Sequence, residues 1–147
     1  MSNADVSRRL VEEVINGRNL DLIDELVTED YVYIDNSLGR FEGPAALKAI
    51  MTKSQQAFPD TVWTIEEQVS QGDILASRFT WSATHREDFD VLPATGKHMT
   101  VTVISFDTFR DGRMQETRQF RDNLGLLRQL GFILEREALA EMIGQRK

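Results

Sequence analysis

From Thr61 onward the hydrophobic pattern changes from a helical period to a period of two, and this change constrains the fold most. Four alternating segments follow, at residues 61–70, 74–84, 99–109 and 113–123. The first two and the last two are joined by short turns that contain glycine, and the middle pair by the longer loop 85–98. Strands that follow one another through short turns form an antiparallel meander.

The first sixty residues have the pattern of three helices and one short strand. Apolar residues recur at helical spacing over residues 6–15 and 20–27, and a third helix is expected to begin at Pro44 and to end before Pro59. Tyr31, Tyr33 and Asp35 alternate in a short strand and share one face. Helices followed by a curved antiparallel sheet predict an α+β domain, a cone-shaped barrel in which the helices close one side over an apolar pocket.

We expect residues 1–147 to form a single domain, with its core at about residues 10–131 and a C-terminal helix at about residues 135–145. The net charge of −7 argues against a nucleic-acid or anionic membrane partner, because both require a clustered positive surface. No apolar run approaches the length that spans a bilayer, and the chain has no cysteine, which predicts a cytoplasmic protein. Two histidines without cysteine do not favour a metal site.

The last alternating segment carries the strongest candidate for chemistry. Met114, Glu116, Arg118, Phe120 and Asp122 share one face by the two-residue period, and the opposite face is uniformly polar. If the mixed face points into a concave interior, its charged groups are withdrawn from water, which proteins tolerate chiefly where the charges have a use. We therefore expect Asp122 and Arg118 to be the catalytic pair.

The turn before this segment sets which residues face inward. A two-residue turn would place Arg110 opposite Arg113 and Asp107 opposite Glu116, two like-charge pairs that oppose pairing. We therefore predict a three-residue turn. In that register the inner face consists of Ile104, Phe106, Met114 and Phe120 around Glu116, Arg118 and Asp122, whereas Val101, Val103 and Phe109 form an outer face suited to a homodimer contact.

Five stretches, taken in order, resemble the SnoaL-like polyketide cyclase family of the nuclear transport factor 2-like superfamily. They are residues 19–32 (NLDLIDELVTEDYV), 41–50 (FEGPAALKAI), 57–73 (AFPDTVWTIEEQVSQGD), 83–97 (ATHREDFDVLPATGK) and 122–131 (DNLGLLRQLG). The resemblance covers about residues 10–131 and implies the cone-shaped α+β fold. It also implies cofactor-free acid–base chemistry on a polyketide-like or other apolar carbonyl compound, such as an aldol-type cyclisation or an isomerisation.

The family's catalytic aspartate matches Asp122, and burial there would raise the pKa of that carboxyl toward neutrality. Arg118 is placed to hold a substrate oxygen, although relatives often carry tryptophan there, and histidines of relatives are replaced by Thr108 and Ile34. The more distant limonene-epoxide hydrolases use an Asp-Arg-Asp set. Arg78 could match the arginine of that set, but Thr80 stands where the second aspartate is expected.

Several further residues are candidates for substrate contact. These are Tyr33, Asp35, Arg78, His85, His98, Phe106, Met114, Glu116 and Phe120. Structural alternatives remain open: Asp122 could cap the turn that follows it, Arg118 could pair with an internal carboxylate, and the histidines could be hydrogen-bonding loop residues. The functional alternatives are a non-catalytic binder of an apolar molecule and a relative of polyketide hydroxylases. The interpretation as an enzyme depends on Asp122 being buried.

Overall fold

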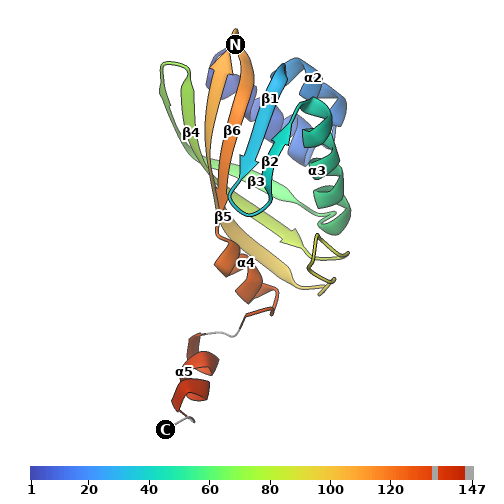
Figure 1. Ribbon diagram of the computed structural model, residues 1–147, viewed down its shortest axis with the longest axis vertical. Coiled ribbons are helices and arrows are strands. Elements are labelled where there is room, and N and C mark those ends of the chain that lie inside the picture. Colours follow the sequence, from blue (N-terminus) through green and yellow to red (C-terminus); the bar gives the residue numbers. More distant parts are fainter. Residues whose placement is uncertain (134–135, 145–147) are drawn as a thin grey trace.

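The computed structural model describes residues 1–133 and 136–144 and is shown in Figure 1. The helical elements are α1 (Asn3–Arg9), the π-helical turns η1 (Leu10–Asn16), the 3-10 turn η2 (Leu20–Leu22), α2 (Ile23–Leu26), α3 (Pro44–Ala57), α4 (Asn123–Gln129) and α5 (Arg136–Gly144). The strands are β1 (Val27–Asp35), β2 (Gly39–Glu42), β3 (Val62–Gln71), β4 (Ile74–Thr84), β5 (His98–Arg110) and β6 (Arg113–Arg121).

The N-terminal helices form where the apolar spacing predicts them. Ser2 caps α1 by accepting a hydrogen bond from the Asp5 amide, and the Asp5 carboxylate accepts one from the Ser2 amide. Helix α3 begins at Pro44 and ends before Pro59, as predicted. The second helix is shorter than predicted, because the chain becomes extended at Val27 and continues directly into β1.

The strands of the described residues form one mixed sheet in the order β2-β1-β6-β5-β4-β3. The predicted antiparallel meander from β3 to β6 is confirmed, and so is the α+β class. Strand β1 pairs in parallel with β6, and the short β2 hydrogen-bonds to its outer edge. The sheet stays open, with β2 and β3 at its edges, and helices α2 and α3 lie against one side of it (Figure 1).

The predicted register of the β5–β6 hairpin is wrong. The turn has two residues, and Arg110 does lie opposite Arg113. This like-charge pair is accommodated because the Arg110 guanidinium makes two hydrogen bonds to the Asp30 carboxylate, at 3.0 and 2.7 Å. A β-bulge at Gln115 then shifts the pairing, so that Thr108 lies opposite Glu116 and Asp107 opposite Thr117.

The two-residue turn sets which side chains of β5 face the helices, and the bulge sets this for β6 beyond Gln115. Val101, Val103 and Phe109, expected on the outer face, are buried on the inner one. Beyond the bulge, the inward positions of β6 are Thr117, Gln119 and Arg121, which belong to the polar face that was expected to meet solvent. Ile104, Phe106 and Phe120, expected inside, are 42%, 51% and 55% exposed on the outer side of the sheet.

The C-terminal segment leaves the sheet at Arg121. Helix α4 follows at once, and α5 lies apart from the sheet in Figure 1. Positions 135 and 145, the ends of the predicted C-terminal helix, lie outside the described residues, but α5 occupies the positions between them. In the part of the chain that the structure describes, every helix is too short or too polar to cross a membrane.

Candidate functional site

A pocket lies between the N-terminal helices and the concave side of the sheet. Its apolar wall comes from the helices, chiefly Leu10, Val11, Ile15, Leu47, Ile50 and Met51, and its aromatic wall from Trp63, Phe79, Trp81 and Phe89. Its polar lining comes from adjacent strands: Tyr31 and Tyr33 of β1, Ser105 and Asp107 of β5, and Thr117, Gln119 and Arg121 of β6. The cavity has a volume of about 90 Å³, which is room for a small organic molecule.

Asp107 is the carboxyl group in the lining of this pocket, and only 3% of the residue is exposed. Its Oδ1 accepts a hydrogen bond from the Thr117 hydroxyl at 2.7 Å, and its Oδ2 accepts one from the Ser105 hydroxyl at 3.2 Å. The Tyr31 hydroxyl donates in turn to the Thr117 oxygen at 2.7 Å. Burial raises the pKa of Asp107 from 3.8 to about 6, although both hydroxyl donors lower it.

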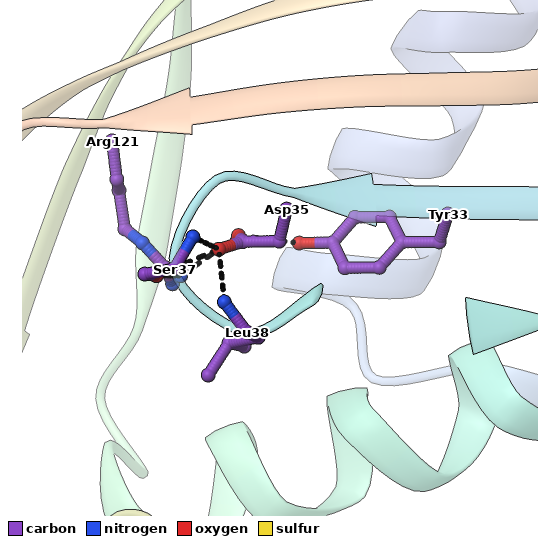
Figure 2. A network of polar contacts seen from close by, with 5 residues as sticks. All are labelled: Tyr33, Asp35, Ser37, Leu38 and Arg121. Atoms are coloured by element: carbon purple, nitrogen blue, oxygen red, sulfur yellow. Dashed lines mark hydrogen bonds and ion pairs between the residues drawn. The ribbon is translucent and has the colours of Figure 1, made fainter. Parts of the chain in front are cut away.

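A second buried carboxyl group, Asp35, lies where β1 ends and has a very different environment (Figure 2). Its Oδ1 accepts from the Ser37 amide, the Ser37 hydroxyl and the Leu38 amide, at 2.9, 2.7 and 3.0 Å. Its Oδ2 accepts from the Tyr33 hydroxyl at 3.1 Å and from Arg121 Nη2 at 2.8 Å. Burial alone would raise the pKa of Asp35, but Arg121 and the Ser37 and Leu38 donors outweigh it and lower that pKa.

Two neighbouring carboxyl groups, Asp107 in the pocket lining and Asp35 beside the pocket, therefore have their pKa values moved in opposite directions. Asp35 stays ionised, and the hydrogen bonds that it accepts hold the turn, the Tyr33 hydroxyl and Arg121 in place. Asp107 accepts only from neutral hydroxyl groups and titrates near pH 6. Such a separation of pKa values distinguishes a structural carboxylate from one that can exchange a proton near neutral pH.

Two donor side chains in the pocket have hydrogen-bonding capacity that the described residues do not use. The Gln119 amide group makes no side-chain hydrogen bond among them, and the residue is 8% exposed. Arg121 bonds to Asp35 and Ser37 only through Nη2, and its Nε is buried without a partner. The Arg121 guanidinium also lies 5.8 Å from the centre of the Trp81 ring.

The expected positions of Asp122 and Arg118 are wrong. Asp122 is exposed just after the end of β6, where its Oδ1 accepts a hydrogen bond from the Gly125 amide at 2.9 Å. It caps α4, which is the structural alternative that the sequence left open. The Arg118 side chain is 63% exposed and pairs with Glu116 at 2.7 Å on the outer side of the sheet. Asp122 therefore provides no support for an enzymatic function.

The other candidates divide between the pocket and its outside. Tyr33 lines the pocket and Asp35 lies buried beside it. Arg78 lies outside the pocket and pairs with Glu67 at 2.7 Å. Glu116 is half-buried, Phe106 and Phe120 are exposed, and Met114 is buried in the core, so none of these four lines the pocket. His85 is fully buried and stacks on Phe58, and the exposed His98 bonds to Thr84 Oγ1 at 3.1 Å; neither lines the pocket.

Asp107, Thr117, Gln119 and Arg121 are the site residues that the sequence analysis missed. One signal was available, because Ser105 and Asp107 share the two-residue period of β5 with Val101, Val103 and Phe109. A carboxyl group on the most apolar face of a central strand is expected to be buried. That signal was lost because the hairpin register placed this face on the outside.

Comparison with known proteins identifies the fold and the family. The model of the SnoaL-like polyketide cyclase family matches residues 5–130. IdmH, a candidate polyketide cyclase from Streptomyces antibioticus, is 27% identical with a TM-score of 0.79, over 89% of this chain and 99% of that one. A candidate SnoaL-like polyketide cyclase from Jannaschia sp. CCS1 is 22% identical with a TM-score of 0.82, over 90% and 93% of the two chains.

AclR, a candidate hydroxylase from Streptomyces galilaeus, shares the fold at 23% identity and a TM-score of 0.77, over 90% of this chain and 97% of that one. Among curated proteins, none matches the sequence significantly. The family match extends over most of the chain, from α1 to the end of α4, and therefore includes all the strands that line the pocket. The chain belongs to the SnoaL-like polyketide cyclase family.

Proposed function

We propose that the protein is a cofactor-independent acid–base enzyme that moves a proton next to the carbonyl group of an apolar compound, as a cyclase or isomerase does. The observation that carries this proposal is Asp107, a buried carboxyl group that lines an apolar pocket and has a pKa of about 6. A carboxylate with an ordinary pKa is a weak base, and the raised value makes Asp107 a stronger base that is still largely ionised at neutral pH.

The proposed step transfers a proton from the carbon next to a substrate carbonyl to the Asp107 carboxylate. The electron pair of the broken C–H bond moves into the carbonyl group, whose oxygen becomes an enolate, and the proton can then return to another carbon. Gln119 is two positions along β6 from Thr117, the residue opposite Asp107. A side chain at such a diagonal position is within reach, so its amide N–H can donate to the enolate oxygen.

The family name and the similarity to IdmH support this class of reaction, and the apolar pocket supports an apolar substrate. The reaction can be tested without the natural substrate by exchange of the protons next to a ketone. We would incubate 2-tetralone with the protein in deuterated water and follow loss of the C1 proton signals by NMR. General-base catalysis typically accelerates a reaction about 10²–10⁴-fold. The exchange rate in excess of that in buffer should therefore fall at least about a hundredfold in Asp107→Asn.

Asp122→Asn provides the matched control, because it removes a carboxylate that lies at the surface and not in the pocket. It should retain the wild-type exchange rate. The wild-type rate should also increase as the pH rises through about 6, because only the ionised Asp107 accepts a proton. Exchange that is no faster than in buffer, or that Asp107→Asn leaves unchanged, would contradict the proposal. Ketone binding detected through Trp63 and Trp81 fluorescence would then indicate a non-catalytic binder.

A further inference from the structure

The end of the pocket at the β1–β2 turn contains a cation whose hydrogen-bonding capacity is only partly used. Arg121 lines the pocket, and its side chain is only 6% exposed. Within the described part of the chain, Nη2 donates all the hydrogen bonds of Arg121, and its Nε is buried without a partner. A buried donor that stays unsatisfied is destabilising, and more so when the group is charged. Arg121 Nη1 is also without a hydrogen bond among these residues and, unlike Nε, is not fully buried, so an oxygen acceptor in the pocket can reach it.

The charge around this group indicates which kind of oxygen fits. The Asp35 carboxylate lies 2.8 Å from Arg121 Nη2 and neutralises the guanidinium, and the same carboxylate is already satisfied by the turn and by Tyr33. A ligand carboxylate would add an excess negative charge to a buried, neutral pair, which is unfavourable in a site of low polarity. A neutral acceptor, such as an ether, hydroxyl or carbonyl oxygen, can use the free N–H groups without that penalty.

The position of Arg121 along β6 gives the length of the ligand. Thr117, Gln119 and Arg121 follow one another on the inner face, and each step of two residues advances by about 7 Å. The proton-transfer group Asp107 lies opposite Thr117, at the far end of this row. An oxygen held at Arg121 is therefore separated from the carbonyl held at Gln119 by about the width of two fused rings.

We propose that Arg121, held by Asp35, binds a second, neutral oxygen of the substrate, remote from the reacting carbonyl. The substrate class is then an uncharged fused-ring ketone with oxygen groups at both ends. Trp81, which lies against the Arg121 guanidinium, and Phe79 on the same wall provide aromatic surfaces for such rings. This inference rests on the proposed function for the orientation of the ligand, but it concerns binding and is measured separately from turnover.

The test compares two ligands of nearly equal shape, 6-methoxy-2-tetralone and 6-ethyl-2-tetralone, which differ in one oxygen. Their dissociation constants would be measured by quenching of tryptophan fluorescence, with the wild type and with Asp35→Asn/Arg121→Met. The double variant removes both charges together and leaves no buried charge unpaired. A hydrogen bond from a charged donor predicts that the wild type prefers the methoxy ligand about tenfold and that the double variant shows less than about a twofold preference.

Arg118→Lys serves as the control, because Arg118 lies on the outer side of the same strand, and it should keep the tenfold preference. If the double variant does not fold, Arg121→Lys tests the same point, since it keeps a cation beside Asp35 but lacks the guanidinium nitrogens. An equal affinity of the wild type for both ligands, an unchanged preference in the variants, or no binding of either ligand at its solubility limit would overturn the proposal.

The two proposals can fail independently of each other. Asp107→Asn should lose proton exchange and keep the preference for the methoxy ligand, because it leaves Arg121 intact. Wild-type protein that shows the preference without proton exchange would support the oxygen site and contradict the enzymatic function. Wild-type protein that exchanges protons without the preference would support the enzyme and contradict the oxygen site.

Discussion

The buried Asp107 predicts a specific pH dependence of folding stability, which Asp107→Asn should remove. In the native state the pKa of Asp107 is raised to about 6, whereas its ordinary value of 3.8 applies to the unfolded chain. Between these values the native protein binds one more proton than the unfolded chain, so stability falls as the pH rises. The rise from 3.8 to about 6 corresponds to about 3 kcal/mol, at about 1.4 kcal/mol for each pKa unit.

Urea denaturation at a series of pH values between 3.5 and 8 would measure this effect, with the free energy of unfolding compared between the wild type and Asp107→Asn. Every other titrating group is common to the two proteins, so its contribution cancels in the difference. As the pH rises from 4 to 7, the free energy of unfolding of the variant should increase by about 3 kcal/mol relative to that of the wild type. Above pH 7 this difference should stay constant. A difference that stays constant to within about 1 kcal/mol from pH 4 to 7 would refute the assignment of a raised pKa to Asp107.

Three further predictions concern the other groups. Asp35→Asn leaves the buried charge of Arg121 unpaired and should lower the free energy of unfolding in urea by about 3–5 kcal/mol, and a loss below about 1 kcal/mol would contradict the ion pair. Asp122→Ala removes the cap of α4 and should cost about 1 kcal/mol in the same assay, whereas proton exchange should not change. The exposed Phe106 and Phe120 favour a homodimer through the outer sheet face. Light scattering should then find a dimer that Phe106→Glu converts to a monomer, and a monomeric wild type would exclude this contact.

The elements of the fold could be predicted because each has a local signal. Proline at the first position defines the start of α3, and alternation defines the bounds of β4 to the residue. The parallel pairing of β1 with β6 could not be predicted in this way, because it joins residues about eighty positions apart and neither strand has a local sequence pattern that indicates its partner. Strand β2 was missed because its four residues are mostly exposed and are too few to show a period.

The site was predicted poorly because its position depends on the register of one hairpin. The like charges of Arg110 and Arg113 oppose pairing when β5 and β6 are considered alone, but the Asp30 carboxylate that makes the pairing tolerable comes from β1. The uniformly polar face of β6 was assigned to solvent. In a domain with a ligand pocket, however, a polar face can be the one that is buried, as Thr117 and Gln119 are here.

The bulge at Gln115 gives β6 two possible linings, of which the native chain uses one. Because successive side chains point to opposite sides, pairing Gln115 regularly with Thr108 instead of bulging it would turn Arg118 and Phe120 toward the helices and Gln119 outward. Deletion of Gln115 would instead leave a regular ladder that keeps Thr117, Gln119 and Arg121 inside. Sequence alignments within the family should accordingly place a one-residue gap in this strand at the bulge, since a gap placed further along the strand assigns the wrong side chains to the pocket.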